Sequence, residues 1–358
     1  MRKRSFCTGL LALLLTTAST PVAAATPEVE LVGQTALPHG MPFEGTTVGG
    51  LSGIDFDPRT GQWVLISDDR SELQPARFYT ARLELGREVE VELTGTAPLR
   101  RPDGSTYPAR SLDPEDIRWD PKTGALWWTS EGDREGQLID PSVRIAAPDG
   151  GHVGELPLPP NLHVTPSTGP KANEALEALT FTAGGALVVT AMEGPLLEDG
   201  ESPTTEHGAL TRITVQDRAG EVRAQYAYPL DPVFATSPTG GFSNNGISAI
   251  LASGQDPFRY LVVERSFVTG VGNSIRIYEA DVRGATDVRD VSGLHQAPVQ
   301  PVRKRLLADL GELGLDTVDN IEGITWGPRL PDGRRSLVLV SDDNFAPDQV
   351  TQIVVLAV

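Results

Sequence analysis

The chain has 358 residues, with 48 acidic against 30 basic side chains and a formal net charge of −18. This acidic balance argues against nucleic acids and anionic membranes as partners, because charges of the same sign repel. The only cysteine is Cys7, so disulfides and thiolate metal sites are excluded from the rest of the chain.

The chain starts with three basic residues at positions 2–4, an apolar stretch and a run of small residues before Thr26. This order is typical of a secretory signal peptide and is too short to cross a membrane. We therefore expect residues 1–25 to be removed and residues 26–358 to form one domain, exported to the periplasm or the medium. The mature chain would have no cysteine and a net charge of −21, because three basic and no acidic residues are lost. We expect it to be a monomer without membrane insertion.

Five related segments then follow along the chain. Each has a short strand-like stretch, a turn marked by Gly, Asp-Gly or Asp-Pro, and a second stretch rich in Val, Leu, Ile and Trp. An acidic residue or a serine opens each segment, and consecutive openings are 63, 62, 71 and 74 residues apart. These anchor residues are Ser52, Glu115, Glu177, Ser248 and Glu322.

Further strand-like stretches follow most of these pairs, at 77–85 and 89–95, 209–217 and 221–230, and 274–282 and 304–310. A four-stranded antiparallel unit repeated in this way predicts an all-β fold, a β-propeller. The last unit has only residues 351–358 left, so residues 29–37 are expected to complete its sheet and close the ring. We count five blades. A sixth, degenerate blade or a large β-sandwich are the alternatives.

If the first strand of each blade lines a central channel, the starts of the first strands and the ends of the second strands meet at one channel mouth. The repeat would thus gather up to eight carboxylates there. Crowded carboxylates raise one another's pKa or require a cation. With no His or Cys in the pattern, oxygen ligands favour Ca²⁺, and Mg²⁺ or Mn²⁺ are the alternatives. The predicted metal ligands are Asp68, Glu115, Glu131, Glu177, Glu193, Glu264, Glu322 and Asp342. Asp116 stands beside one of them, and the alternative for each acid is a structural hydrogen bond or a solvated rim.

Three arginines stand beside these acids: Arg70, Arg134 and Arg265. A guanidinium group either neutralises its neighbours or clamps a phosphate or carboxylate of a substrate. We predict substrate contacts for all three, with Arg265 as the first choice because apolar residues flank it.

Other chemistries find less support. The five histidines are scattered without zinc-site spacing, and no G-x-S-x-G, Walker or Rossmann pattern occurs. Serines recur just before the second-strand acid, at Ser67, Ser130 and Ser341. We interpret them as hydrogen-bonding residues at strand ends.

The segments "DPEDIRWDP", "NEALEALTF", "YLVVERSF" and "NIEGITWGPRLPDGRRSLVLVSDDNF" resemble the phytase-like family described as "esterase-like activity of phytase". The resemblance extends from about Gly49 to Val358. It implies a secreted propeller that hydrolyses phosphate or related esters at an acidic channel mouth, with calcium as in the β-propeller phytases. Motif by motif, it points to Glu115, Glu177, Glu264, Arg265, Glu322, Asp342 and Asp343 as recurring polar positions.

We therefore expect a metal-dependent hydrolase of a small anionic or ester substrate, in which Glu322 or Glu177 is the general base and Arg265 steadies the anion. Two alternatives remain: a calcium-dependent lactonase or carboxylic esterase, and a propeller that binds a ligand or partner without catalysis.

Overall fold

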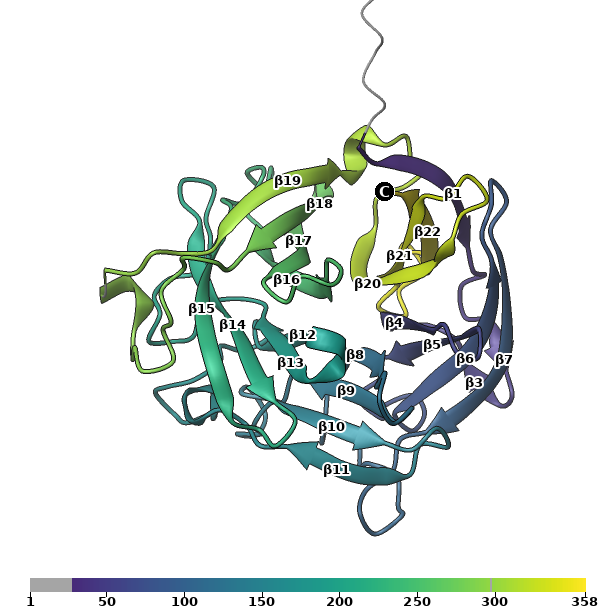
Figure 1. Ribbon diagram of the computed structural model, residues 1–358, viewed down its shortest axis with the longest axis horizontal. Coiled ribbons are helices and arrows are strands. Elements are labelled where there is room, and N and C mark those ends of the chain that lie inside the picture. The colour runs from purple at the N-terminus through teal and green to yellow at the C-terminus, as the bar shows by residue number, and fades with distance from the viewer. Residues whose placement is uncertain (1–27, 297) are drawn as a thin grey trace, which may run out of the picture.

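The computed structural model describes residues 28–296 and 298–358, so the expected signal peptide, residues 1–25, lies outside the described residues. Five four-stranded antiparallel sheets stand around a central axis (Figure 1). The all-β propeller with five blades is confirmed, and the six-bladed and sandwich alternatives are wrong.

Blades 1 to 4 each use four consecutive strands. Blade 1 contains β4 (Leu51–Asp57), β5 (Gln62–Ser67), β6 (Arg77–Glu84) and β7 (Glu90–Pro98). Blade 2 contains β8 (Pro114–Trp119), β9 (Leu126–Ser130), β10 (Ser142–Ala146) and β11 (His152–Leu156). Blade 3 contains β12 (Leu176–Thr182), β13 (Leu187–Met192), β14 (Ala209–Asp217) and β15 (Val222–Leu230). Blade 4 contains β16 (Ser243–Ala252), β17 (Arg259–Val268), β18 (Gly272–Asp281) and β19 (Arg303–Asp309).

Blade 5 joins the two ends of the described chain. Its strands are β20 (Asn320–Arg329), β21 (Arg335–Asp342), β22 (Gln352–Ala357) and β1 (Glu30–Ala36). β1 pairs antiparallel with β22, from Glu30 opposite Ala357 to Ala36 opposite Gln352. This closure confirms the expected pairing of residues 29–37 with the C-terminal strand, and it gives blade 5 the same four strands as the other blades.

Short elements complete the fold: a hairpin of β2 (Pro42–Phe43) and β3 (Thr46–Thr47), and 3₁₀ turns at Pro160–Leu162, Ala183–Gly185, Leu294–Gln296 and Leu310–Glu312. In the described part of the chain, no helix has both the length and the apolar character needed to cross a bilayer.

The apolar core is divided into layers between neighbouring blades. Alternate residues of each strand face one neighbouring sheet or the other, which is why most strands are rich in aliphatic residues on both faces. The layer between blades 4 and 5, for example, packs Ile277 and Val263 against Ile324 and Leu339. Four comparable layers lie between the other pairs of blades. The sheets are therefore held face to face around the axis, with their first strands innermost.

Arg118 closes the channel partway along its length. It belongs to β8, and its guanidinium group donates to backbone carbonyls on the innermost strands of all four other blades. The acceptors are Ile54 (2.6 Å), Leu179 (2.8 Å), Ile324 (2.9 Å) and Ile250 (3.4 Å). Asp116 accepts a further hydrogen bond of 2.8 Å from Arg118, so this acid has a structural role. The arginine separates an acidic cavity at one mouth from a more apolar one, lined by Trp119 and Trp326, at the other.

Candidate active site

The repeated anchor residues lie at breaks in the sheet register. In each blade the pairing between the first two strands shifts by one residue at the anchor, which is the geometry of a β-bulge. A bulge turns a side chain away from the face that strand alternation would give it. We call these positions the bulge ring: Ser52, Glu115, Glu177, Ser248 and Glu322.

The three glutamates of the bulge ring line the acidic cavity, whereas the two serines bond the next blade. Ser52 Oγ donates to the carbonyl of Glu115 at 2.6 Å, and Ser248 Oγ donates to that of Ile321 at 2.9 Å. The anchor positions thus serve both the cavity and the contact between blades.

The small residue that follows the anchor allows the innermost strands to approach closely. A Cβ atom on Gly53 would lie 2.8 Å from the Cα of Asp116, and one on Gly323 would lie 3.0 Å from the backbone nitrogen of Ile54. Neither distance leaves room for a side chain without movement of the neighbouring backbone. The repeated pattern of acid, small residue and aliphatic residue therefore combines a cavity group with tight packing around the axis.

A second ring lies where the second strand of each blade ends. The strand pairing places these residues opposite the position two before each anchor; Gly246, for instance, is opposite Arg265. We call this set the strand-end ring: Asp68, Glu131, Glu193, Arg265 and Asp342. Four of the five carry a carboxylate, and the fifth is an arginine.

The expectation that Glu264 is a metal ligand at this mouth is wrong. Glu264 pairs with Ile247, one residue before the ring, and consecutive strand residues face opposite sides. Because Arg265 faces the cavity, Glu264 lies between the blades, where it accepts hydrogen bonds from Tyr228 Oη at 2.8 Å and the backbone of Asp231 at 3.0 Å. It also forms an ion pair with Lys304.

The cavity at this mouth has a volume of about 680 Å³. It brings together most of the predicted residues, namely Asp68, Arg70, Glu115, Glu131, Glu177, Arg265, Glu322 and Asp342. Glu193 adjoins it, because its Oε1 accepts a 2.8 Å hydrogen bond from the Arg265 guanidinium. Asp343 is buried beside it and accepts from the backbone of Gly50 at 2.8 Å.

Sequence reasoning missed several residues that line this cavity, chiefly Asp113, Asn273, Asn320 and Asn344. Asp113 and Asn320 both stand two positions before an anchor and lie opposite a strand-end acid. Asn320 donates to Glu322 at 3.0 Å and to Asp342 at 3.1 Å, which ties the two rings together in blade 5. Aligning the segments on this earlier position would have revealed both residues.

Two groups of three carboxylates are close enough to share a cation. Asp113, Glu115 and Glu131 form one group, and Glu131, Glu177 and Glu193 form the other. In each group, one oxygen per residue lies within 4.8 Å of the others. Glu131 belongs to both groups, so it links blades 2 and 3.

The buried oxygens of the second group fit a cation. Glu193 is fully buried, yet its Oε2 has no hydrogen-bond partner among the described residues. A buried anionic oxygen without a partner is costly, and an oxygen-liganded metal ion would supply the missing interaction. The buried acidic groups could therefore hold a metal ion, and all of the donors are carboxylate oxygens.

The pKa values of these carboxyl groups also indicate that their negative charges are poorly compensated. Burial, reinforced by the charge of Asp113, raises the pKa of Glu131 to about 8. Burial likewise raises the pKa of Glu193 to about 8, even though Arg265 acts in the opposite direction. The pKa values of Glu115 and Glu177 are also raised well above their ordinary range, by burial and then by neighbouring carboxylates.

Arg265 is the counter-charge within the rings. Besides its contact with Glu193, one of its guanidinium nitrogens lies 3.8 Å from Glu322. Burial alone would lower the pKa of Arg265, but Glu193 and Glu322 raise it, so the group stays protonated. Its Nε is buried and has no hydrogen-bond partner among the described residues.

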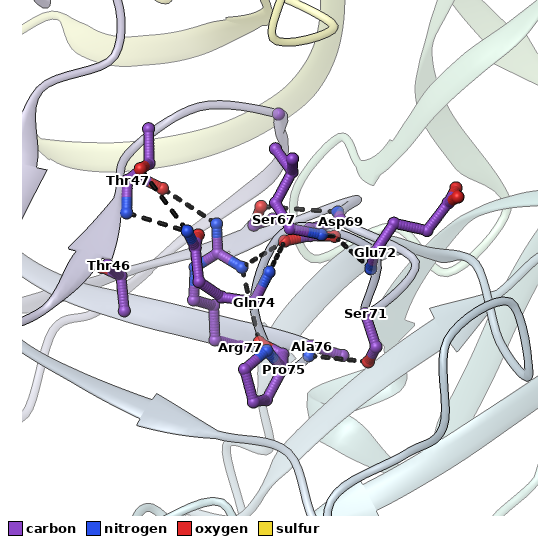
Figure 2. A network of polar contacts seen from close by, with 12 residues as sticks. Thr46, Thr47, Ser67, Asp69, Ser71, Glu72, Gln74, Pro75, Ala76 and Arg77 are labelled. Carbon is purple, nitrogen blue, oxygen red and sulfur yellow. Dashed lines mark hydrogen bonds and ion pairs between the residues drawn. The ribbon is translucent and has the colours of Figure 1, made fainter.

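Arg70 lies on a loop held in place by a buried network (Figure 2). Asp69 accepts hydrogen bonds from the backbone of Glu72 at 2.8 Å and Gln74 at 2.9 Å, and from Arg77 at 2.7 Å. Arg77 in turn donates to the carbonyl of Thr47 at 2.9 Å. This network fixes the loop whose neighbouring residues, Asp68 and Arg70, reach the cavity.

The expectation that Arg134 contacts substrate in this cavity is wrong. Its guanidinium donates to the carbonyls of Thr165 and Thr168, both at 2.6 Å, and to that of Pro170. Those three hydrogen bonds hold the loop before β12. Arg134 is therefore not among the residues that line the acidic cavity.

The serines before the strand-end ring form strand-end hydrogen bonds, as expected. Ser67 donates to the carbonyl of Gly49 at 2.9 Å, and Ser341 donates to that of Val350 at 2.6 Å. Ser130 accepts from the backbone of Asp113 at 2.9 Å.

Comparison with solved structures finds proteins of low sequence identity. An endo-arabinase from Bacteroides thetaiotaomicron VPI-5482 has 12% identity and a TM-score of 0.47, covering 87% of this chain and 94% of its own. A thermostable family-43 glycoside hydrolase has 11% identity and a TM-score of 0.49, with coverage of 86% and 88%. The periplasmic gluconolactonase of Pseudomonas aeruginosa has 14% identity and a TM-score of 0.36, with coverage of 87% and 86%. Curated proteins gave no match.

A family model gives a more specific result. The model described as "Phytase-like: Esterase-like activity of phytase" matches residues 46–345, which includes both rings, blades 1 to 4 and the strands β20 and β21 of blade 5. Its description indicates an ester hydrolase. The chain belongs to this phytase-like family.

Proposed function

We propose that the protein is a metal-dependent ester hydrolase whose active site is the acidic cavity. The observation that carries this proposal is the pair of buried carboxylate groups that share Glu131, beside a protonated arginine. Calcium suits an all-carboxylate donor set best, and Mg²⁺ or Mn²⁺ would be the alternatives. Glu131, Glu177 and Glu193 would hold the ion, with Asp113 and Glu115 available for a second position.

A bound cation would polarise the ester oxygen and lower the pKa of a nearby water. The chain's own residues would do the rest. Glu322 would accept a proton from the attacking water; its pKa is raised by burial, which makes it a stronger base than an exposed glutamate. Arg265, 3.8 Å from Glu322, would stabilise the negative charge that develops on the ester oxygen. The water oxygen would form the new bond to phosphorus or carbon while the bond to the ester oxygen breaks, and the departing alkoxide would take up the proton held by Glu322 and leave as the alcohol.

The scarcity of cationic groups favours a carboxylic ester or lactone as the second candidate substrate. Among the described residues that line the cavity, the basic ones are Arg70 and Arg265. Arg70 lies 3.4 Å from Asp113, and Arg265 contacts Glu193. A substrate with several phosphates would find few groups to neutralise it, whereas an ester with one negative charge or none would not need them.

The test measures binding and turnover on the same sample. Chelator-stripped protein should lose hydrolysis of phosphomonoesters, carboxylic esters or lactones, and Ca²⁺ should restore both turnover and melting temperature. Glu131→Gln should abolish the calcium-induced rise in melting temperature, because both carboxylate groups include Glu131. Glu264→Gln is the matched control: this acid is equally buried but lies outside the cavity, so its variant should keep the rise. Full activity after chelation would refute the proposal.

A further inference from the structure

Blade 4 extends beyond the other blades at the acidic mouth. The second strands β5, β9 and β13 end one residue before the strand-end ring, and β21 ends on it. β17 instead continues three residues past Arg265 to Val268, paired throughout with β16 and β18. The extension forms a wall on one side of the cavity.

Two phenylalanines form the cavity side of this wall. Phe267 lies two residues after Arg265 on the same strand, so both side chains point to the same face. Phe242 directly precedes β16, and its side chain is 63% exposed. The two rings are 6.3 Å apart between centroids, with an interplanar angle of 31°, and both residues line the cavity. We call Phe242 and Phe267 the aromatic platform.

Phe242 is exposed and Phe267 is half-buried, so the platform favours a ligand with an apolar face. An exposed phenylalanine contributes nothing to the core, and apolar surface at a cavity mouth is a common mark of a binding site. Asn273 lies directly opposite Phe267 in the sheet and also lines the cavity. The wall therefore offers an apolar surface beside a polar residue.

The spacing between the platform and the charged centre limits the size of the ligand. Residues two apart on a strand are separated by about 7 Å, so Phe267 stands that far from Arg265 along β17. One aromatic ring attached directly to an ester group bridges such a step. A small, fully polar substrate would leave the platform uncovered.

We propose that the aromatic platform binds the ring of an aryl ester, which makes substrates with an aromatic group next to the scissile bond the preferred class. The inference rests on the proposed function and names the substrate class of the same cavity. Stacking on Phe242 and Phe267 would place the ester group at Arg265 and the buried carboxylates.

The experiment compares phenyl and methyl esters of the same acid, using phosphoric and acetic esters with calcium-loaded protein. Phe242→Ala and Phe267→Ala should each lower the ratio of kcat/KM for phenyl over methyl about tenfold, because a stacked ring is lost. Phe258→Ala is the matched control, since Phe258 is 47% exposed at the opposite end of the same hairpin. If both platform variants keep the same phenyl-to-methyl ratio of kcat/KM as Phe258→Ala, the inference is overturned.

A binding measurement separates this inference from the proposed function. Calorimetry with phenylphosphonate and methylphosphonate needs no turnover. If no ester is hydrolysed, the proposed function fails, yet tighter binding of phenylphosphonate that disappears in Phe242→Ala still supports the platform. Equal affinity for the two phosphonates, or no binding of either, overturns the platform whether or not esters are hydrolysed.

Discussion

Arg265 is the one residue of the strand-end ring that is not an acid, and this difference defines its role. It replaces the carboxylate that the other four blades supply, and it lies partly buried between Glu193 and Glu322. A single arginine thus offsets part of the charge of seven ring carboxylates, while a cation would offset the remainder.

Replacing Arg265 by lysine keeps the charge but removes the rigid fork of donors. We expect kcat to fall about a hundredfold, the usual cost of losing one oriented donor to a developing anion, and the melting temperature to change little. Arg265→Gln should lose activity and also melt lower in metal-free protein, because the ring carboxylates lose their counter-charge. Steady-state kinetics and thermal melting of both variants check this; unchanged kcat in Arg265→Lys would contradict it.

Asp69 determines the position of its neighbours without lining the cavity. Asp69→Asn would leave the buried Arg77 guanidinium without its anionic partner, so we expect a loss of about 3 kcal/mol of unfolding free energy. Asp133→Asn is the control: Asp133 accepts backbone N–H groups of Glu135, Gly136 and Gln137 in the matching loop of blade 2, and no arginine pairs with it among the described residues. That variant should lose only about 1 kcal/mol. Denaturant unfolding compares the two, and equal losses would count against this role of Asp69.

The site residues show where sequence reasoning ends. The acids at Asp68, Glu131, Glu193 and Asp342 were predictable, because each follows a recognisable second strand. The choice between Glu264 and Arg265 was not, since a one-residue shift of register reverses which side chain faces the cavity. Glu264 and Arg265 are neighbours in the sequence, and only the pairing of Gly246 with Arg265 shows which of the two side chains faces the cavity.

At the level of the strands, the register shifts at the anchors are the main finding that the sequence pattern did not predict. Strand positions were predictable from alternating apolar residues and turn signals: β14, for example, matches the expected 209–217. A bulge leaves no such signal, because Ser52, Glu177 or Glu322 would be equally acceptable in an unbroken strand. The tight contact made by Gly53 became apparent only with the neighbouring blade in place.

Gly53→Ala tests this packing. The new Cβ would lie 2.8 Å from the backbone of β8, so the innermost strands of blades 1 and 2 would have to separate, and we expect a loss of about 2 kcal/mol or more. Gly154→Ala on the outer strand β11 is the control, because its Cβ would meet nothing closer than 4.0 Å. Denaturant unfolding should show little or no loss for that variant. Equal stability of the two variants would refute the close-packing argument.

For the whole molecule, the raised pKa values link stability to pH when the metal is stripped. Glu131 and Glu193 keep their protons in the folded state up to about pH 8, whereas their ordinary pKa is 4.5. Between these values the folded chain binds more protons than the unfolded chain, so stability is highest at the acid end and falls as pH rises.

We therefore expect metal-free protein to melt about 5 °C or more lower at pH 9 than at pH 6. With Ca²⁺ the difference should shrink or disappear, because the ion holds the carboxylates in their ionised form. Differential scanning calorimetry with chelator and with calcium measures both curves. A metal-free protein that is more stable at pH 9 would contradict the assignment of strained, buried acids.

Arg118 also sets the route by which molecules move through the ring. Because its bonds to four other blades seal the passage, whatever enters the acidic mouth must leave by the same opening. Departing alcohol and acid would then meet incoming ester in a single vestibule, so released products should compete with fresh substrate. The channel of the propeller therefore acts as a pocket with one opening and not as a pore through the molecule.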